Sequence, residues 1–467
     1  MDRIADRSDR FDRGGRRPRS PALFLVTGTF GALVLVTAQL YYFVKLQSVI
    51  AGLSGAGFWL SVAFGTSFLL CCWVAAVRYV LMMLCAYFGW AASVRPVSRP
   101  IRWPRVSVLI PAYNEAGRIA ATLRSILSLD YPDFQVIVVD DGSEDETLDA
   151  AAEFARSDGR VRVLRKPNGG KSSALNLGFH ESSGDLVFCV DADSQLEPSS
   201  LRRIVPLFED PRVGAVAGQV RVRNRGTLVS KLQALEYALM NGMPRLAQSN
   251  FAQVLIAPGP IAVFRRNLLE EIWKRWGSAE PHSARAGAVA GPWESDTFAE
   301  DCDVTLNALL LRYRVVFQPA AISFTTSPAG LFPLLNQRYR WIRGNLQAIK
   351  KCWRRWHALP SAPGALPLWL SLFIVETVVW PAVNIYGLVL FVALVATVGQ
   401  IGNLWPWYLI LLGIEVNAAA FSIRAVGEKA VLIVLMPIFR SVYGVILDVN
   451  TLCAVCAELM RQRMRWA

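Results

Sequence analysis

Histidine is scarce in this chain: only His180, His282 and His357 occur among 467 residues. A site centred on a histidine base or on several histidine ligands is therefore disfavoured, and carboxylates are the better candidates for proton transfer. The eight cysteines show no metal-ligand spacing. Cys453 and Cys456 lie in an apolar segment, where helix packing is a simpler interpretation than redox chemistry. Reduced thiols fit an active domain that faces the cytosol.

Charged residues are also few, at 18% of the chain against 53% hydrophobic residues. This balance excludes a single soluble enzyme and indicates a chain with membrane spans. The net charge of +13 comes mostly from arginines beside apolar runs, which favours the lipid bilayer and its anionic headgroups as their partner. No basic-aromatic pattern occurs outside the membrane-flanking segments, so we expect no nucleic-acid partner.

The N-terminal segment predicts a membrane hairpin over residues 21–95. Residues 1–20 have the composition of a disordered basic tail. The apolar run 21–44 is long enough to span a bilayer, and a second span is expected over 58–77. No A-x-A cleavage site follows the first run, so we expect an anchor and not a removed signal peptide. Arginines at both ends place the ends of the hairpin in the cytosol.

The C-terminal part of the chain is apolar again. We expect an interfacial segment over 351–378, followed by transmembrane and interfacial helices over 379–460. Full spans are expected from near Trp380 and over 404–423. The last apolar run, 430–459, contains charged residues and a proline. We expect it to be an interfacial or re-entrant helix, which leaves both termini in the cytosol.

Between the apolar ends, residues 105–325 alternate short β-rich runs with helical stretches. The runs VSVLI, QVIVVD, VRVL and DLVFCVD are separated by candidate helices over 118–129, 144–156 and 172–180. This rhythm predicts a doubly wound, mostly parallel sheet. Ligands bind such sheets at the carboxyl ends of the strands, which is where the polar motifs occur.

One of these runs ends in Asp191-Ala192-Asp193. Two carboxylates at the end of a buried strand offer oxygen ligands to Mg²⁺ or Mn²⁺ and, through the metal, to a diphosphate. The alternative interpretation is a solvated, Asp-rich turn.

Two earlier strands end in residues suited to a nucleoside. After the first, Tyr113 could stack on a base and Glu115 could hydrogen-bond to it; the alternative is a turn with a helix cap at Asn114. After the second, Asp140 and Asp141 could accept hydrogen bonds from a base or ribose. The alternative there is a capping box between Ser143 and Glu146.

Two glycines and a lysine precede the helix that follows the third strand, in the sequence Asn168-Gly169-Gly170-Lys171. Such a loop at a helix start could hold a phosphate, and a surface turn is the alternative. Further along, Glu300 and Asp301 open another helix. The helix dipole alone favours acids there, but a carboxylate at this position could also act as a general base for a hydroxyl.

The last motif is Gln337-Arg338-Tyr339-Arg340-Trp341. On a helix, Gln337 and Trp341 share a face. The arginine could bind a diphosphate and the tryptophan could stack on a sugar or base. The alternative is a basic interfacial helix with an aromatic anchor.

Taken in order, the motifs PAYNE, DDGS, NGGK, DAD, AED and QRYRW between two groups of apolar runs resemble the membrane-embedded family 2 glycosyltransferases. Cellulose, chitin, hyaluronan and poly-N-acetylglucosamine synthases belong to that family. The resemblance covers about residues 105–350 by motif. It implies an α/β GT-A (Rossmann-like) cytosolic glycosyltransferase domain, here residues 100–350, inserted between N- and C-terminal transmembrane helices.

The resemblance also implies a role for each motif. A UDP-sugar donor would contact Tyr113, Glu115, Asp140, Asp141, Lys171 and Asp191. Asp191 and Asp193 would bind Mg²⁺ or Mn²⁺. Asp301, with Glu300 beside it, would act as the general base. Arg340 would contact the diphosphate, and Gln337 and Trp341 would contact the acceptor.

The activity implied by the resemblance is a single inverting displacement that extends a β-linked polysaccharide, with UDP-GlcNAc or UDP-glucose as donor. The growing polysaccharide is the acceptor, and the chain would be multi-pass in the inner (plasma) membrane, with its catalytic domain cytoplasmic. A small membrane subunit or export partner is a possible further partner. Two alternatives stay open: transfer of one sugar to a lipid acceptor, and an inactive scaffold that senses nucleotide sugars.

The sequence departs from the family pattern at two places. Ala299 stands where many members have threonine, but both acids of the motif are present. The Gly/Ala/Pro-rich stretch 276–293 is longer than the connection in many relatives. It could be a loop over the acceptor site or an insertion with no catalytic role.

Overall fold

The computed structural model describes residues 20–50, 55–95, 102–277, 287–359, 364–398 and 405–462. Residues 1–19, in the predicted tail, and 278–286, in the predicted loop, lie outside this part. The chain forms two compact units. The α/β unit comprises residues 95–234, 248–382 and 446–467, and the helical unit comprises 1–94, 235–247 and 383–445.

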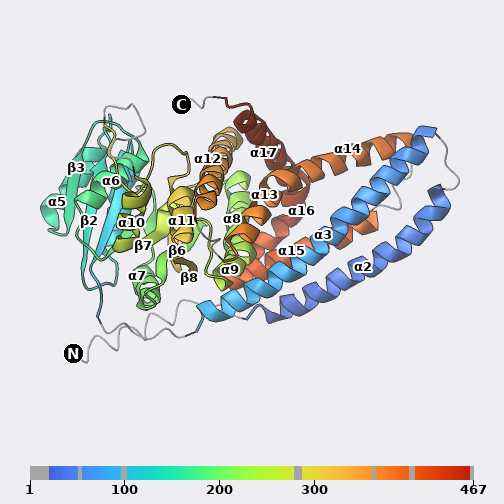
Figure 1. The fold of residues 1–467 in the computed structure, drawn as a ribbon, viewed down its shortest axis with the longest axis horizontal. Helices are drawn as coiled ribbons and strands as arrows, with labels where there is room; N and C mark the ends of the chain where they lie inside the picture. Colours follow the sequence, from blue (N-terminus) through green and yellow to red (C-terminus); the bar gives the residue numbers. More distant parts are fainter. Residues whose placement is uncertain are drawn as a thin grey trace. The chain divides into compact units, whose positions relative to one another are not determined.

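The core of the α/β unit is a sheet in which the described residues form eight strands, in the order β3-β2-β1-β4-β7-β6-β8-β5. Figure 1 labels β2, β3, β6, β7 and β8 of this sheet. The valine- and isoleucine-rich runs 106–112 and 134–140 form two neighbouring strands of this sheet, because β-branched residues suit a sheet covered on both faces. The strands are β1 (Val106–Ala112), β2 (Phe134–Asp140), β3 (Val161–Arg165), β4 (Leu186–Cys189), β5 (Gln195–Leu196), β6 (Val213–Val222), β7 (Ala262–Arg265) and β8 (Arg314–Thr325).

The first half of the sheet confirms the predicted parallel arrangement. β1 pairs in parallel with both β2 and β4, and β2 pairs in parallel with β3. The second half is mixed, because β7 runs antiparallel to β4 and β6, and β5 runs antiparallel to β8. The strand order reverses at β1, between β2 and β4. Crevices at such a reversal are the usual ligand sites of open α/β sheets.

The three helices predicted over 118–129, 144–156 and 172–180 correspond to α4, α5 and α6, with starts that differ by one to three residues. α6 packs against β1 and β2, and Gly178 permits this because a Cβ there would lie 3.2 Å from Leu109 Cδ2. The helices are α4 (Ala116–Leu127), α5 (Thr147–Ser157), α6 (Lys171–His180), α7 (Ser200–Ile204), α10 (Arg266–Trp276), α11 (Glu300–Leu310), α12 (Leu331–His357) and α13 (Leu366–Ile374).

The helical unit is held together by packing among α2 (Ala22–Ile50), α3 (Gly55–Ser93) and α15 (Trp405–Ala425). Polar side chains form hydrogen bonds between these helices. Asn417 Nδ2 donates to Phe24 O at 2.8 Å, and Thr27 Oγ1 donates to Asn417 Oδ1 at 2.8 Å. Polar bonds of this kind join helices in an apolar solvent, where water cannot compete for them.

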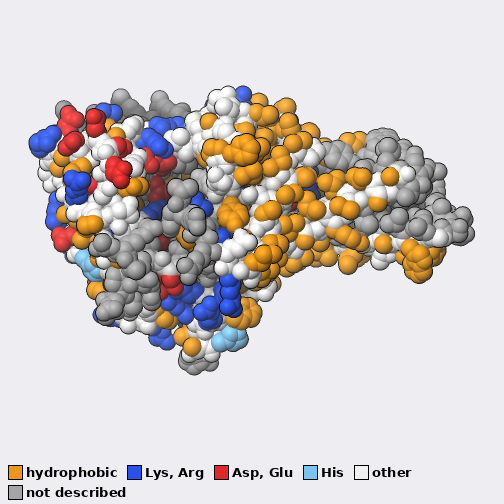
Figure 2. All heavy atoms as spheres, turned by 90° about the horizontal axis from the view of Figure 1, so that it is seen from above, with side chains coloured by type: hydrophobic (Ala, Val, Ile, Leu, Met, Phe, Trp, Pro, Cys, Tyr) orange, Lys and Arg blue, Asp and Glu red, His pale blue; other side chains and the backbone are white. Residues whose placement is uncertain are grey.

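Three stretches of the described residues are long and apolar enough to cross a membrane: Trp73–Ser93, Leu366–Val389 and Ala430–Leu459. Hydrophobic side chains gather over the long helices, whereas charged side chains gather over the α/β unit (Figure 2). Large apolar residues such as Phe30, Trp59 and Leu70 are exposed on the surface of the helical unit. Exposed apolar surface of this kind suits lipid better than water.

The C-terminal helices differ in detail from the predicted ones. Residues 366–398 form one continuous helical stretch, in which the π-helical turn Val375–Val379 joins α13 to α14 (Trp380–Val398). The last apolar run is likewise helical from Ala430 through α16 (Met436–Ile438) to α17 (Gly444–Leu459). The interfacial positions predicted for 351–378 and 430–459 stay predictions, although the second run is long enough to span.

Candidate active site

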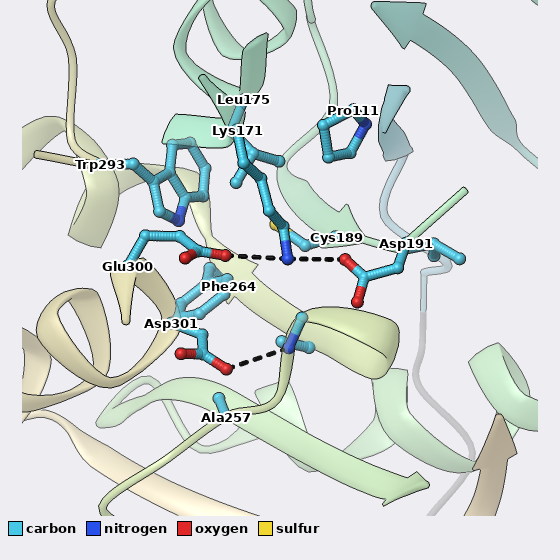
Figure 3. Close-up of a pocket in the computed structure, with 13 residues that line it drawn as sticks. Pro111, Lys171, Leu175, Cys189, Asp191, Ala257, Phe264, Trp293, Glu300 and Asp301 are labelled. Atoms are coloured by element: carbon cyan, nitrogen blue, oxygen red, sulfur yellow. Dashed lines mark hydrogen bonds and ion pairs between the residues drawn. The ribbon is translucent and has the colours of Figure 1, made fainter. Parts of the chain in front are cut away.

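A pocket lies at the carboxyl ends of β1 and β4, where the strand order reverses (Figure 3). Stretches far apart in sequence supply its walls: the end of β1, the start of α6, the turn after β4 and the start of α11. The fold thus brings four of the predicted site residues together. The charged or aromatic lining residues are Lys171, Asp191, Phe264, Trp293, Glu300 and Asp301.

Lys171 joins two of the acidic motifs. Its Nζ lies 2.7 Å from Asp191 Oδ1 and 2.8 Å from Glu300 Oε1 (Figure 3). Burial disfavours the charged ammonium, but Asp191, Glu300 and Asp301 outweigh this effect and raise the pKa of Lys171 well above its ordinary value. The ammonium therefore stays charged at neutral pH and holds together carboxylates that would otherwise repel one another.

Asp301 lies in the first turn of α11, with its carboxylate inside the pocket. Its Oδ1 accepts a hydrogen bond from Cys302 N at 2.8 Å, and its Oδ2 faces Gly259 N at 3.4 Å. Burial, and then the neighbouring Glu300, raise the pKa of Asp301 to about 6, while Lys171 acts in the opposite direction. A carboxylate with a pKa near neutrality suits a general base.

Asp191 and Asp193 lie in the turn that follows β4. Asp193 Oδ1 accepts from Ser194 Oγ at 3.2 Å and from Thr325 Oγ1 at 3.4 Å. Burial, and then the charge of Asp191, raise the pKa of Asp193 above its ordinary value. The turn is therefore partly buried and electrostatically strained by its own charges, unlike a freely solvated Asp-rich turn.

Glu115 extends this acidic cluster at the end of β1. Its Oε2 lies 2.9 Å from Arg118 Nε. Burial raises the pKa of Glu115 to about 7. The charges of Asp193 and Asp191 also raise it, whereas Arg118 lowers it. The adjacent Tyr113 is 44% exposed, so its ring is accessible for the predicted stacking on a base.

A divalent cation fits this cluster because it would relieve the mutual repulsion of Asp191, Asp193 and Glu115. Among the described residues, no three His, Cys, Asp or Glu side chains are arranged as a metal site. A cation held by Asp191 and Asp193 would therefore take further ligands from water or a bound phosphate, as Mg²⁺ commonly does.

Asp141 and Asp140 have different environments at the end of β2. Asp141 accepts hydrogen bonds from Gly169 N at 3.0 Å, from Gly170 N at 2.7 Å and from the Lys166 ammonium. These bonds hold the glycine loop that leads into α6. Asp140 is fully buried. Its Oδ1 accepts a hydrogen bond from Ser143 N at 3.4 Å, and its Oδ2 lies 3.6 Å from Arg165 Nε. The contact of Asp140 with a nucleoside stays a prediction.

Both predicted helix caps in this region are wrong. α4 begins after Glu115, and Asn114 instead adopts a left-handed conformation with φ of 55° and accepts a hydrogen bond from Glu144 N at 2.9 Å. Ser143 Oγ accepts from Asn114 N at 3.0 Å, and the N-cap of α5 is Glu146. The two loops bond to each other: the side chains of Asn114 and Ser143 each form a hydrogen bond to the neighbouring loop and do not cap the helix that follows them.

The helical arrangement predicted for the last motif is confirmed, since Gln337, Arg340 and Trp341 lie on α12. Arg338 donates to Gln337 Oε1 at 3.0 Å and stacks over the Trp341 ring, with its guanidinium carbon 4.2 Å from the ring centroid. These residues do not line the pocket around Asp301. Their roles toward the acceptor and diphosphate stay predictions.

α12 nevertheless contacts the segment that leads into α11. A Cβ added to Gly344 would lie 2.7 Å from Ala299 N and 2.7 Å from Phe298 C. Only glycine permits this approach, which brings the motif helix directly against the residues before Glu300. A glycine three residues beyond the motif could have suggested such a contact, but not its partner.

Sequence reasoning missed two further parts of the site. Asn176 of α6 donates to Val289 O at 2.8 Å and to Trp293 O at 2.9 Å, and it accepts from Trp293 N at 3.0 Å. The described end of the predicted loop 276–293 is thus fixed on α6. Gly259 faces Asp301 and lies so close to Lys171 that a Cβ would be 2.7 Å from Nζ. Its place in Pro-Gly-Pro indicates a turn, but not a contact with the site.

The α/β unit has the GT-A fold. The mannosyltransferase PcManGT from Pyrobaculum calidifontis, solved with GDP-Man and Mn²⁺, has the same fold. It matches 83% of this chain and 97% of its own with a TM-score of 0.57 and 22% sequence identity.

Residues 107–273 match the family model described as Glycosyl transferase family 2. The poly-beta-1,6-N-acetyl-D-glucosamine synthases of Staphylococcus epidermidis and Staphylococcus aureus (strain MSSA476) are each 29% identical over 245 residues, which are 52% of this chain and 55% of theirs. The match thus spans about half the length of these curated relatives. Residues 107–273 thus form a family 2 glycosyltransferase domain.

Proposed function

We propose that this protein is a membrane-bound inverting glycosyltransferase that polymerises a β-linked polysaccharide from UDP-GlcNAc or UDP-glucose and translocates it across the inner (plasma) membrane. The observation that carries the proposal is the pocket in which Asp301 lies beside the Lys171–Asp191–Glu300 cluster. The names of the staphylococcal relatives favour UDP-GlcNAc as the donor.

The donor would occupy the carboxyl ends of β1, β2 and β4. Tyr113 would stack on the uracil, and Asp140 and Glu115 would accept hydrogen bonds from the nucleoside. Asp141 would act by holding the glycine loop, to which it is already bonded. Asp191 and Asp193 would hold a divalent cation, for which the Mn²⁺ of the mannosyltransferase structure is a precedent. Such a cation stabilises the negative charge of a departing diphosphate.

Asp301 would take the proton from the acceptor hydroxyl. The freed oxygen forms a bond to the anomeric carbon of the donor as the bond from that carbon to the diphosphate breaks, and UDP leaves with the bonding electrons. A single displacement of this kind inverts the anomeric centre. Lys171 would support it in two ways: it fixes Asp191 and Glu300 in place, and its charge favours ionised Asp301. Most of the catalysis would therefore come from positioning and charge.

Gln337, Arg340 and Trp341 on α12 would contact the acceptor and the diphosphate. The apolar helices would anchor the protein as a multi-pass membrane protein with a cytoplasmic catalytic domain. The growing polysaccharide would be the acceptor, and a small membrane subunit or export partner would act with the chain.

Donor screening with the purified full-length protein tests this proposal. UDP-[¹⁴C]GlcNAc and UDP-[¹⁴C]glucose are supplied separately, and the product is analysed for length and linkage. We expect long, β-linked product from one donor and none from the Asp301→Asn variant. A product that carries one sugar on a lipid would support the single-transfer alternative. Nucleotide-sugar binding without turnover would support the inactive scaffold and contradict the proposal.

A further inference from the structure

A single side chain bridges the segment before Asp301 and the last described helix of the chain. Gln347 of α12 accepts a hydrogen bond at Oε1 from Phe298 N at 3.4 Å, and its Nε2 donates to Glu458 Oε2 at 3.0 Å. Phe298 lies three residues before Asp301, and Glu458 lies near the end of α17. The oxygen of the Gln347 amide thus binds the segment before Asp301, and the nitrogen of the same amide binds α17.

The same carboxylate binds a second residue of α12, one turn earlier. Arg343 Nε lies 3.0 Å from Glu458 Oε2, and a terminal nitrogen of Arg343 donates to Gln462 O at 2.5 Å. The Arg343 side chain is only 4% exposed, so its charge has little access to water. A buried arginine that loses its carboxylate leaves an uncompensated charge, which is strongly unfavourable. The buried Arg343 therefore requires the carboxylate of Glu458 at its present position.

The backbone of α12 completes the contact with the approach to α11. Thr297 Oγ1 donates to Gly344 O at 3.4 Å and accepts from Ala299 N at 2.9 Å. Together with the bond from Gln347 to Phe298, these contacts fix residues 297–299. Asp301 follows after one further residue, so a shift of this segment moves its carboxylate.

A separate set of ion pairs holds α12 to α11 and to the segment before it, without Glu458. Lys351 lies 2.9 Å from Asp303 Oδ2 and 3.0 Å from Glu294 Oε2, and Arg355 lies 2.7 Å from Glu294 Oε1. The two helices would therefore stay packed if the contact with α17 were changed. The consequence of such a change would be a displacement within the site and not its loss.

We infer that Glu458 is a positioning residue for glycosyl transfer: through Gln347 and Arg343 it sets the backbone at 297–299 and thereby the position of the Asp301 carboxylate. This inference rests on the proposed function, in which Asp301 is the base. It links the rate of transfer to the position of α17, the final part of the apolar stretch Ala430–Leu459. A displacement of about 1 Å at a reacting group can lower a rate by about 100-fold.

An exchange of the two side chains tests the inference in the full-length protein, with UDP-[¹⁴C]GlcNAc as donor. Gln347→Glu places a second carboxylate against Glu458, and Glu458→Gln removes the charge that Arg343 binds. We expect each single variant to lower kcat by about 10-fold or more, with an unchanged KM for the donor. The double variant restores one carboxylate and one amide beside Arg343, and its kcat should return to within about threefold of the wild type.

Glu181→Gln is the matched control, because Glu181 forms an exposed ion pair with Arg162 outside the site; its kcat and KM should equal those of the wild type. Wild-type kcat in both single variants, or a double variant no better than the worse single one, would overturn the inference.

Hydrogen exchange separates a failure of this inference from a failure of the proposed function. If the wild type transfers no sugar from any UDP-sugar, the proposed function fails. Exchange in the peptide 294–303 still reports on the contact. It should be faster in Gln347→Glu than in the wild type and recover in the double variant, while exchange in 171–180 stays constant. Unchanged exchange in 294–303 would refute the role of Glu458.

Discussion

At the scale of single residues, the candidate active site is a balance of opposite charges. Three carboxylates, from Asp191, Glu300 and Asp301, surround the one ammonium of Lys171. The lysine opposes the rise in the pKa of Asp301 that burial and Glu300 cause. The cluster keeps a net negative charge, which a cation can reduce. Each acid can therefore have a separate role within a small volume.

The variant Asp301→Asn tests the assignment of the base. The amide has nearly the same shape as the carboxylate but cannot accept the proton of an acceptor hydroxyl. We expect transfer to fall by about 10²–10⁴-fold, while UDP binding, measured by calorimetry, stays unchanged because the donor residues are intact. Near-normal turnover in this variant would show that another group is the base.

The raised pKa of Asp301 predicts a particular pH dependence. With a pKa of about 6, the carboxyl is mostly protonated at pH 5 and cannot act as a base, whereas above pH 7 it is ionised. We therefore expect the rate at saturating donor to rise through about pH 6 and then level off. UDP affinity measured over the same range separates this effect from loss of donor binding. A rate that is constant from pH 5 to 7 would contradict the assignment.

The acidic turn after β4 predicts a requirement for a divalent metal. Asp193→Ala removes one of two expected carboxylate ligands, and EDTA removes the cation. We expect either change to abolish transfer, and Mg²⁺ or Mn²⁺ to restore the rate of the EDTA-treated wild type but not that of the variant. An activity indifferent to EDTA would rule out this role for Asp191 and Asp193.

The sequence predicted which strand ends carry the site, but not the contacts between them. Asp191 and Asp301 could be singled out because each follows or opens a regular element. The ion pairs of Lys171 depend on the spatial meeting of α6, β4 and α11, which no local pattern encodes. Trp293 and Gly259 were missed for the same reason. Asn114 and Ser143 were misassigned because local capping rules do not account for a bond to the neighbouring loop.

At the scale of elements, the parallel half of the sheet was the most predictable part of the fold. Three of its strands, β1, β2 and β4, are mostly apolar runs, and each is followed by a turn signal. The antiparallel strand β7 was not predicted, because the four-residue run Ala262–Arg265 has no distinctive pattern. Its place between β4 and β6 is set by tertiary pairing.

The close contact of α12 with the start of α11 makes Gly344 sensitive to substitution. In Gly344→Ala, the new methyl group meets backbone atoms of Phe298 and Ala299, which cannot rotate away. We expect the free energy of unfolding to fall by about 1–3 kcal/mol, seen as a lower melting temperature, together with reduced transfer.

Gly387→Ala is the control for this prediction, because a Cβ at Gly387 in α14 meets nothing within 4 Å. That variant should be as stable as the wild type or slightly more stable, since alanine favours a helix by about 0.5–1 kcal/mol over glycine. Equal stability of the two variants would show that the contact at Gly344 can relax.

At the scale of the whole molecule, one chain joins an α/β transferase unit to helices that suit a lipid solvent. The apolar helices agree with a position in a membrane. A polymer made by a membrane-bound enzyme can be released on the side of the donor or passed to the other side. The side of the membrane on which the product accumulates therefore shows whether the helices only anchor the enzyme or also export its product.

Reconstituted vesicles with the α/β unit on the outside provide this test, with labelled UDP-sugar supplied only outside. If the protein translocates its product, labelled polymer should accumulate inside and resist a glycosidase added outside, until detergent makes the vesicles permeable. A processive enzyme should also give long chains early, while most of the donor remains, because each chain is extended many times before release. Vesicles with Asp301→Asn should contain no polymer. Short products that the glycosidase digests without detergent would mean that the helices anchor the enzyme and do not export its product.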